Sequence, residues 1–397
     1  MSDKLNHISQ AYLRDTDLAH RKALGQYFTP KDVREHLLSR LPRMRGASVL
    51  DPACGSGEFL LSAGEFFEDC ELFGWEIDRK LVNLCREVVP EAKVSRVDSL
   101  RRTLDEQFDF VIGNPPYFEF KPDAEVRNRF SRVISGRANI FSMFVQLGLE
   151  ALKPGGFLAY VIPPSMNNGA YFAGLRDYII RHADIEYLKI LDSSALFDRA
   201  QQTVMIMVLK KVDNKGDYVF SRSGLTLFSP DAGRLRDAFE GRTTLDELGF
   251  TVRTGRVVWN QHRESLSTKP DGAVPLLWAH NITDDGLSLG NTAKRPQYIK
   301  YNRPDCGPAI VVNRVTGAAT RVRLKAAVVE PGFQFVAENH VNVIYPPAGK
   351  NPYSSVGTLK RICEQIMSAS TIEVMKLITG NTQVSRTELA HLLPLDL

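Results

Sequence analysis

Short apolar runs alternate with helix-like stretches along residues 45–210 of the chain. Runs of this length that are separated by helix-like stretches predict a mostly parallel sheet with helical crossovers. A turn is expected at residues 152–156, directly before the fifth apolar run. The expected strands are 48–50, 72–76, 93–97, 108–112, 157–162, 187–191 and 203–210, and the expected helices are 58–67, 79–88 and 171–182.

The second half of the chain has a different pattern. Residues 213–217 are polar and rich in turn-forming residues, and we place a domain boundary there. Short strands and turns in a less regular mixture are expected to follow, and the apolar spacing in residues 359–378 predicts a helix. Two domains are therefore expected, residues 1–214 and residues 215–397.

Composition narrows the class of protein. The 397 residues are 43% hydrophobic and 24% charged, which excludes a collagen, a disordered tail or a disulfide scaffold. Five cysteines without a CxxC pair favour free thiols in a reducing compartment over a zinc site, and no metal site is expected. The polar N-terminus and the absence of an apolar run of about 20 residues indicate a cytoplasmic protein without a membrane span.

Candidate chemistry lies where the predicted strands end. Asp51, Glu76 and Asp98 each close a strand, and Gly55 and Gly57 form a turn after the first one. Open sheets of this kind bind ligands beyond the carboxyl ends of their strands. Because no Gly-Lys-Ser/Thr follows the two glycines, a phosphate-binding loop is disfavoured. The pocket is expected to take an adenosine-bearing ligand without a phosphate chain.

The segment Asn114-Pro115-Pro116-Tyr117 follows the fourth predicted strand. Two prolines restrict the backbone, so the side-chain oxygen of Asn114 and the carbonyl of Pro115 form a preset pair of acceptors. Such a pair matches the two N–H donors of an exocyclic amine, and accepting both makes the nitrogen more nucleophilic. Tyr117 offers a flat face on which a planar base can stack.

These segments resemble a known family, the S-adenosylmethionine-dependent methyltransferases that make N6-methyladenine in DNA. Their order is similar to that of the gamma class of restriction–modification enzymes: Gly25-Gln26-Tyr27-Phe28-Thr29-Pro30, then the turn 51–57, then 114–117. The resemblance implies that Glu76 binds the ribose hydroxyls, Ile77 lies against the adenine ring, Asp98 accepts the adenine amino group, and Phe197 packs on the target base. The cofactor-binding residues expected from it are Thr29, Pro30, Asp51, Ala53, Gly55, Gly57, Glu76, Ile77, Asp98, Ser99 and Asn114.

The resemblance also implies the fold and the reaction. The fold class is α/β, a Rossmann-like methyltransferase sheet with one antiparallel strand, followed by a mixed α+β target-recognition domain. S-adenosyl-L-methionine is the expected cofactor, and a direct methyl transfer to N6 of a flipped-out adenine is the expected reaction. Asn114 cannot remove a proton and is expected to accept and orient. Asn114, Pro115, Tyr117 and Phe197 are the expected catalytic residues.

Several alternatives stay open at this point. The same turn serves RNA-adenine and protein-glutamine methyltransferases, and N4-cytosine methylation is chemically possible. Cytosine-C5 methylation is excluded, because it needs a Cys nucleophile where Asn114 stands. A DNA-binding subunit with an inactive core is disfavoured, because the expected cofactor and target residues are present. Residues 91–93 have the ExK spacing of a metal-dependent nuclease, but they lie between a predicted helix and a predicted strand. We therefore interpret this spacing as a coincidence and expect no nuclease site there.

Charge distribution indicates where DNA would bind. The net charge of +4 divides into −1 for residues 1–214 and +5 for residues 215–397. Double-stranded DNA is the expected partner, with a separately encoded restriction endonuclease as a further one, and a monomer or weak dimer as the expected state. The expected DNA-binding residues are Arg263, Lys294, Arg295, Lys300, Arg303, Arg314, Arg321, Arg323 and Lys325.

Overall fold

A computed structural model describes residues 5–15, 28–104, 107–167, 169–191, 204–289, 295–314, 323–349, 351–378 and 384–397. The chain divides into two compact units, which are described separately. The N-terminal unit comprises residues 1–219 and 227–230, and the C-terminal unit comprises residues 220–226 and 231–397. Strands β8 (Val219–Arg222) and β9 (Leu225–Phe228) pair where the chain passes between the units.

The N-terminal unit contains a seven-stranded sheet in the order β3-β2-β1-β4-β5-β7-β6. Strand β7 pairs antiparallel with both of its neighbours, and the other pairs are parallel. The expected mostly parallel sheet with one antiparallel strand is thereby confirmed. The strands are β1 (Ser48–Asp51), β2 (Glu71–Glu76), β3 (Lys93–Arg96), β4 (Phe108–Gly113), β5 (Leu152–Ile162), β6 (Asp184–Leu191) and β7 (Val204–Lys210).

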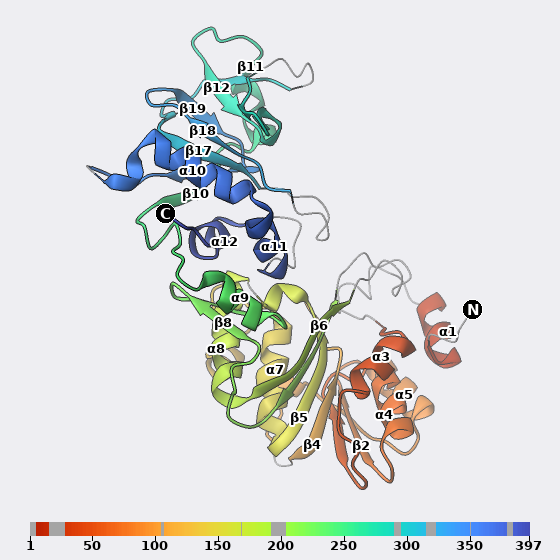
Figure 1. Ribbon diagram of the computed structural model, residues 1–397. Helices are drawn as coiled ribbons and strands as arrows, with labels where there is room; N and C mark the ends of the chain where they lie inside the picture. Colours follow the sequence, from red (N-terminus) through yellow and green to blue (C-terminus); the bar gives the residue numbers. More distant parts are fainter. Residues whose placement is uncertain are drawn as a thin grey trace. The chain divides into compact units, whose positions relative to one another are not determined.

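Helices cover both faces of this sheet (Figure 1). Along β7, Val204, Ile206 and Val208 pack with the helices on one face, whereas Met205, Met207 and Leu209 pack on the other. A strand buried on both faces is apolar at every position, which explains the unbroken apolar run in the sequence. The helices are α1 (His7–Asp15), α3 (Lys31–Leu38), α4 (Glu58–Phe66), α5 (Arg79–Val88), α6 (Ala124–Arg129), α7 (Ile140–Ala151) and α8 (Ala173–His182).

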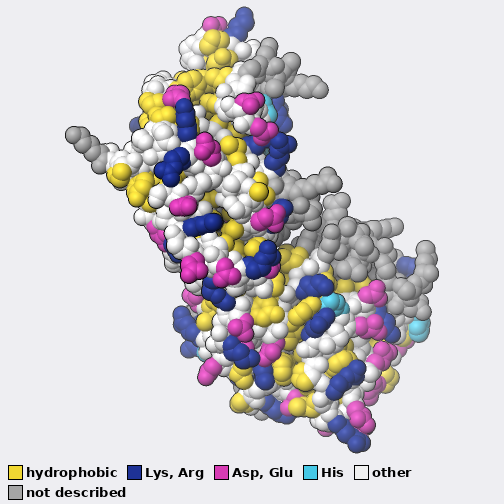
Figure 2. Space-filling view, viewed as in Figure 1, with side chains coloured by type: hydrophobic (Ala, Val, Ile, Leu, Met, Phe, Trp, Pro, Cys, Tyr) yellow, Lys and Arg dark blue, Asp and Glu magenta, His cyan; other side chains and the backbone are white. Residues whose placement is uncertain are grey.

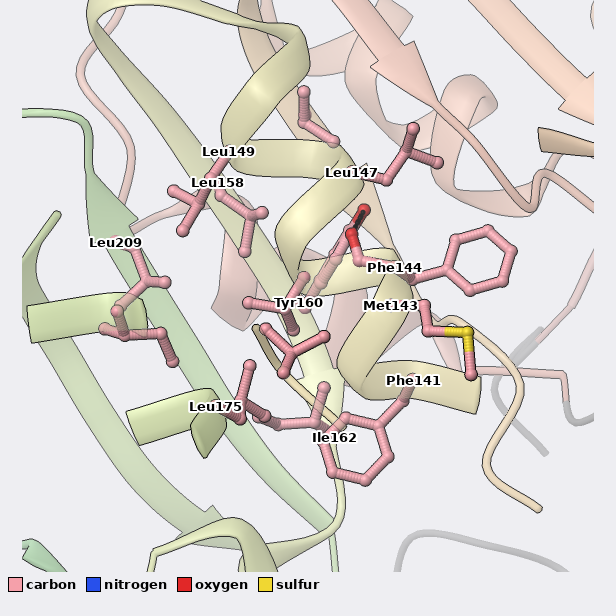
Figure 3. Close-up of a cluster of buried hydrophobic side chains, with 14 of the residues drawn as sticks. Phe141, Met143, Phe144, Leu147, Leu149, Leu158, Tyr160, Ile162, Leu175 and Leu209 are labelled. Carbon is pink, nitrogen blue, oxygen red and sulfur yellow. Dashed lines mark hydrogen bonds between the residues drawn. The ribbon is translucent and has the colours of Figure 1, made fainter. Parts of the chain in front are cut away.

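Helix α7 is absent from the helices expected from the sequence. Its side chains are buried at nearly every position, so it lacks the polar face that makes a surface helix recognisable. Figure 3 shows Phe141 and Phe144 of α7 in the cluster that also contains Tyr160 and Ile162 of β5. Because α7 is buried on all sides, the spacing of apolar and polar residues did not predict this helix.

The expected turn at residues 152–156 lies inside β5 rather than before it. Phe108 pairs with Leu152 and Phe110 pairs with Phe157, so the extra residues form an irregularity within the strand. Gly155 adopts a φ of +80° there, a conformation that favours glycine. The turn-forming residues bend the strand locally without ending it.

The C-terminal unit is a mixture of short strands and helices, as expected for a mixed α+β domain. One sheet has the antiparallel order β10-β20-β17-β18, and a second has the order β11-β15-β12-β19-β16. The strands of these sheets and of one small hairpin are β10 (Thr251–Thr254), β11 (Leu266–Ser267), β12 (Val274–Leu277), β13 (Ile282–Thr283), β14 (Gly286–Leu287), β15 (Tyr298–Ile299), β16 (Asp305–Cys306), β17 (Ala309–Asn313), β18 (Ala326–Val329), β19 (Gln334–Ala337) and β20 (Val341–Tyr345).

The described residues of this unit also form the helices α9 (Ala232–Phe239), α10 (Val356–Met367), α11 (Ala369–Ile378) and α12 (Arg386–His391). The single helix expected at 359–378 is thus two helices that meet at Ser368. The Ser368 hydroxyl donates to Gln365 O at 2.8 Å and accepts from Thr371 N at 3.3 Å, so it stabilises both helix ends. Among the helices of the described residues, none is long and apolar enough to cross a membrane.

Candidate active site

A cavity of about 300 Å³ opens in the N-terminal unit at the carboxyl ends of β1, β2 and β4. Strand order reverses between β1 and β4, which is the position where open α/β sheets bind ligands. Most of the cofactor residues expected from the sequence line this one cavity: Thr29, Asp51, Ala53, Gly55, Glu76, Ile77, Asp98, Ser99 and Asn114.

The turn after β1 contains two glycines, Gly55 and Gly57, whose backbone φ angles are positive. Gly57 is the N-cap of α4 with a φ of +88°, and a Cβ atom there would lie 2.7 Å from Cys85 Sγ. Gly55 has a φ of +54°, but no atom lies within 4 Å of the position that its Cβ would take. Gly57 therefore permits close packing of α4 against α5, whereas Gly55 keeps the cavity wall open.

Glu76, the last residue of β2, holds this turn from the other side. Its Oε2 accepts from Gly55 N at 3.0 Å, and its Oε1 accepts from Asp78 N at 2.8 Å. Burial raises the pKa of Glu76 despite these bonds. Each oxygen keeps a lone pair, so the carboxylate can still accept from a pair of ligand hydroxyls. The adjacent Ile77 lines the cavity with 61% of its surface exposed, so its apolar side chain is accessible to a ligand.

Asp51 at the end of β1 is almost fully buried. Its Oδ1 accepts from Ala53 N at 3.0 Å, and burial raises the pKa of its carboxyl to about 8. A Cβ atom on Gly113 would lie 2.7 Å from Asp51 Oδ1, so the end of β4 passes close to this carboxyl group. A cation in the cavity would stabilise the ionised form of Asp51.

The side chain of Asp98, which follows β3, already has hydrogen-bond and ion-pair partners within the protein. Its side chain accepts from Leu100 N at 3.0 Å, and Asp98 Oδ2 lies 3.3 Å from Arg101 Nε. The adjacent Ser99 donates through its hydroxyl to Pro52 O at 2.6 Å and thereby joins this segment to the turn after β1. Arg101 also lines the cavity, and no sequence motif pointed to it.

The turn after β4 brings Asn114 to the cavity. Asn114 Nδ2 donates to Thr29 Oγ1 at 3.0 Å, and the Tyr117 hydroxyl donates to Asn114 Oδ1. Of the described residues of this turn, Asn114 and Pro116 line the cavity, whereas Pro115 and Tyr117 lie outside its lining. Two segments 85 residues apart in the sequence, the one containing Thr29 and the one containing Asn114, therefore meet at this site.

Five further expected positions lie beside the cavity or outside the described residues. Pro30 is the N-cap of α3, directly after the cavity-lining Thr29. Phe197 and the segment Gly25-Gln26-Tyr27 lie outside the described residues.

An apolar wall of the cavity was missed by the sequence motifs. Phe118 and Phe120 follow Tyr117 at the spacing of an extended chain, which places alternate side chains on one side. Ile140 and Phe144 are four residues apart on α7, the spacing of one helix face, and they would have been found had α7 been predicted. These residues give the cavity an apolar surface in addition to its carboxylates.

Two of the expected DNA-binding arginines in the C-terminal unit lie over tryptophan rings. The Arg295 guanidinium is 4.9 Å from the Trp278 ring centroid, and that of Arg263 is 5.3 Å from the Trp259 centroid. A guanidinium placed over an indole keeps its edge free to form hydrogen bonds. Lys300 and Arg303 are exposed, and Lys294 and Arg321 lie outside the described residues.

Other expected cations of this unit have protein partners. Arg323 Nη2 lies 2.7 Å from Asp284 Oδ2, and Lys325 Nζ lies 3.5 Å from Asp284 Oδ1. Arg314 Nη1 donates to Asn339 O at 3.3 Å. Figure 2 shows that basic and acidic side chains are interspersed over the face in view. Arg323 and Lys325 therefore contribute less positive charge to the folded unit than the sequence suggests.

Comparisons with known proteins give a consistent result. The model of the family described as N-6 DNA Methylase matches residues 1–233. Modification methylase CviBIII of Paramecium bursaria Chlorella virus NC1A is 31% identical over 275 residues, covering 68% of this chain and 69% of the relative. Type II methyltransferase M.BsuBI of Bacillus subtilis is 25% identical over 452 residues, covering 94% and 87%.

Similarity to solved structures is more distant. The type I restriction-modification system methyltransferase subunit from Streptococcus thermophilus is 19% identical, with a TM-score of 0.41, and the match covers 54% of this chain and 53% of that chain.

Proposed function

The chain belongs to the N-6 DNA methylase family, and we propose on that basis how its cavity and its C-terminal unit act on DNA. It is an adenine-N6 DNA methyltransferase of the restriction–modification type, serves as the modification component, and uses S-adenosylmethionine. The RNA-adenine and protein-glutamine alternatives are not favoured, because the matching family is one of DNA methylases. The order of the motifs that contain Thr29, Gly55 and Asn114 supports assignment to the gamma class.

One observation carries the proposed mechanism: a single cavity is lined by Asn114 and by residues from the ends of β1, β2 and β3. The residues present fit the cofactor. Glu76 offers two carboxylate oxygens to ribose hydroxyls, Ile77 offers an exposed apolar face to a purine, and Asp51 offers a buried carboxyl group to a cation. When bound, S-adenosylmethionine supplies a methyl group on a sulfonium, which is already a good leaving group.

Catalysis in this proposal consists of positioning and hydrogen bonding. Asn114 Oδ1 and the Pro115 carbonyl accept the two N–H groups of the adenine amine, which raises the nucleophilicity of N6. Tyr117 stacks on the flipped base, with Phe197 on its other face. Asn114 has no basic group, so the amine loses its proton after the methyl group has been transferred.

Base entry requires one local exchange of hydrogen bonds. The Tyr117 hydroxyl donates to Asn114 Oδ1, which is the oxygen that the adenine amine is proposed to use. The arriving base must therefore replace the Tyr117 hydroxyl at Asn114 while it stacks on the Tyr117 ring.

The C-terminal part of the chain, residues 215–397, is proposed as the target-recognition domain. Arg295 and Arg263, held over indole rings, are suited to contact base edges or phosphates. The enzyme is proposed to act in the cytoplasm as a monomer or weak dimer, with a separately encoded endonuclease as its functional partner. Lys294, Lys300, Arg303, Arg314, Arg321, Arg323 and Lys325 are proposed to add to the electrostatic attraction of DNA.

Expression of the full chain in a bacterial host that lacks adenine methylation tests the proposed function. N6-methyladenine is expected in hydrolysed host DNA by mass spectrometry, and single-molecule sequencing is expected to place it at one short sequence. The variant Asn114→Ala is the control and is expected to leave the DNA unmodified. Methylated RNA or protein with unmodified DNA would refute the proposal.

A further inference from the structure

A buried arginine on α3 connects this helix to Thr29, which binds Asn114 in the turn after β4. Arg34 on α3 has only 2% of its surface exposed. Its Nη1 donates to Thr29 O at 2.6 Å, and its Nε donates to Ser62 Oγ at 2.9 Å. Its Nη2 lies 2.8 Å from Glu58 Oε2 at the start of α4. The guanidinium therefore joins α3, α4 and the residue that binds Asn114.

Stability alone does not account for this arrangement. Desolvation is the largest influence on Arg34 and lowers its pKa, although Glu58 opposes the shift. Buried ion pairs of this kind are often no more stabilising than apolar side chains of the same volume. A planar guanidinium, however, fixes the direction of each of its donors, which an apolar pair cannot do. We therefore attribute to Arg34 a role in fixing the positions of its hydrogen-bond partners rather than a role in stability alone.

Thr29 is the partner that reaches the reaction site. It is 3% exposed, Arg34 holds its carbonyl, and its hydroxyl oxygen lies 3.0 Å from Asn114 Nδ2. The Asn114 amide has one acceptor end and one donor end, and rotation by 180° exchanges them. With the donor end turned toward the adenine amine, two N–H groups would face each other and the amine would lose an acceptor.

We propose that Thr29 and Arg34 are positioning residues: Arg34 fixes Thr29, and the Thr29 hydroxyl holds the Asn114 amide with its oxygen directed to the adenine amine. The inference rests on the proposed role of Asn114. Thr29 is already expected to contact the cofactor. The inference gives it a second task, which is to orient the Asn114 side chain. The consequence is a change in kcat that is separable from cofactor affinity.

The first test compares Thr29→Val, Thr29→Ser and Ser142→Ala in the full-length protein. Valine matches the shape of threonine without its hydroxyl, so kcat is expected to fall about tenfold through loss of one oriented hydrogen bond. Serine keeps the hydroxyl and is expected to restore kcat to within about threefold of the wild type. Ser142 on α7 carries a buried hydroxyl that has no hydrogen-bond partner among the described residues, so its removal is expected to leave kcat unchanged.

Cofactor affinity, measured by calorimetry with S-adenosylmethionine alone, separates the two tasks of Thr29. The inference requires kcat to fall more than cofactor affinity does in Thr29→Val. Wild-type kcat in Thr29→Val, or an equal loss in Thr29→Ser, would overturn it. A wild-type protein that does not methylate adenine would instead refute the proposed function.

A second test addresses Arg34 without leaving a buried charge. The double variant Arg34→Met/Glu58→Leu replaces the ion pair by apolar side chains and is expected to fold, as judged by circular dichroism and thermal unfolding. Its kcat is expected to fall, because Thr29 loses the donor that holds its carbonyl. Adding Thr29→Val is expected to lower kcat no further, since both changes act on the same amide. Fully additive losses in kcat would show that Arg34 does not act through Thr29.

Discussion

Substitution of Gly57 by alanine tests the close packing at the start of α4. Gly57 has a φ of +88°, and a Cβ there would lie 2.7 Å from Cys85 Sγ and 3.2 Å from a Val89 methyl group. The left-handed backbone costs an alanine about 1–2 kcal/mol, and forcing a methyl group into a filled space adds about 1–3 kcal/mol. Gly57→Ala is therefore expected to lower the free energy of unfolding of the N-terminal unit by about 2–5 kcal/mol.

Gly55→Ala is the matched control. Gly55 also has a positive φ, at +54°, but nothing lies within 4 Å of its Cβ position, so only the backbone cost of about 1–2 kcal/mol applies. Because Gly55 lines the cavity, its substitution is expected to weaken S-adenosylmethionine binding more than it weakens folding. The pair separates a glycine needed for packing from one that leaves space for the ligand.

Native-state hydrogen exchange followed by mass spectrometry is the suitable assay, because peptides from β1 and α4 report on the N-terminal unit alone. The double variant Gly57→Ala/Cys85→Ala removes the sulfur atom that the new methyl group would meet. It is expected to be less destabilised than the sum of its single variants. The reasoning fails if Gly57→Ala costs no more than Gly55→Ala, or if the two changes at Gly57 and Cys85 are additive.

Four further predictions concern the site and the C-terminal unit. Asn114→Ala is expected to abolish methyl transfer while calorimetry still detects S-adenosylmethionine binding, and retained transfer would remove the proposed role of Asn114. The folded-state pKa of Asp51, about 8, exceeds its unfolded value, so its contribution to stability is complete at low pH and is lost as pH rises from about 4 to 8; Asp51→Asn is expected to flatten this dependence in denaturant titrations. Binding of the cationic cofactor at pH 7 is expected to release protons from Asp51, and calorimetry in two buffers that shows no release would contradict this. Arg295→Gln is expected to weaken DNA binding more than Arg323→Gln, because Asp284 already neutralises Arg323, and equal losses in fluorescence anisotropy would contradict this difference.

The course of the sheet was predictable because apolar runs mark its central strands, such as residues 110–112 in β4 and 204–209 in β7. Burial on both faces makes β7 apolar from Val204 to Leu209, and the turn after β1 is marked by Gly55 and Gly57. The same burial made α7 unpredictable, since a helix without an exposed face has no contrast between polar and apolar positions. A helix is revealed by the apolar pattern only where solvent touches one side of it, whereas a buried strand is short enough to appear as a plain apolar run.

The sequence also suggested that several charged groups are available to bind a ligand or DNA, whereas the fold gives them partners within the protein. Arg323 and Lys325 count as two positive charges in the sequence, but the fold pairs both with Asp284, which is 39 residues from Arg323. Asp98 likewise stands at a strand end, yet it caps the following turn and contacts Arg101. Such pairings depend on distances in space and cannot be derived from spacing along the chain.

The residues that could carry the chemistry were identifiable from the sequence, because the acids at the strand ends and the turn after β4 are local motifs. Which of them act together depends on the fold. The 3.0 Å hydrogen bond between Asn114 and Thr29 spans 85 residues, and the contact of Arg34 with Glu58 joins two helices. The physical reason is that hydrogen bonds and ion pairs depend on distance and direction, and folding sets both by packing the helices against the sheet.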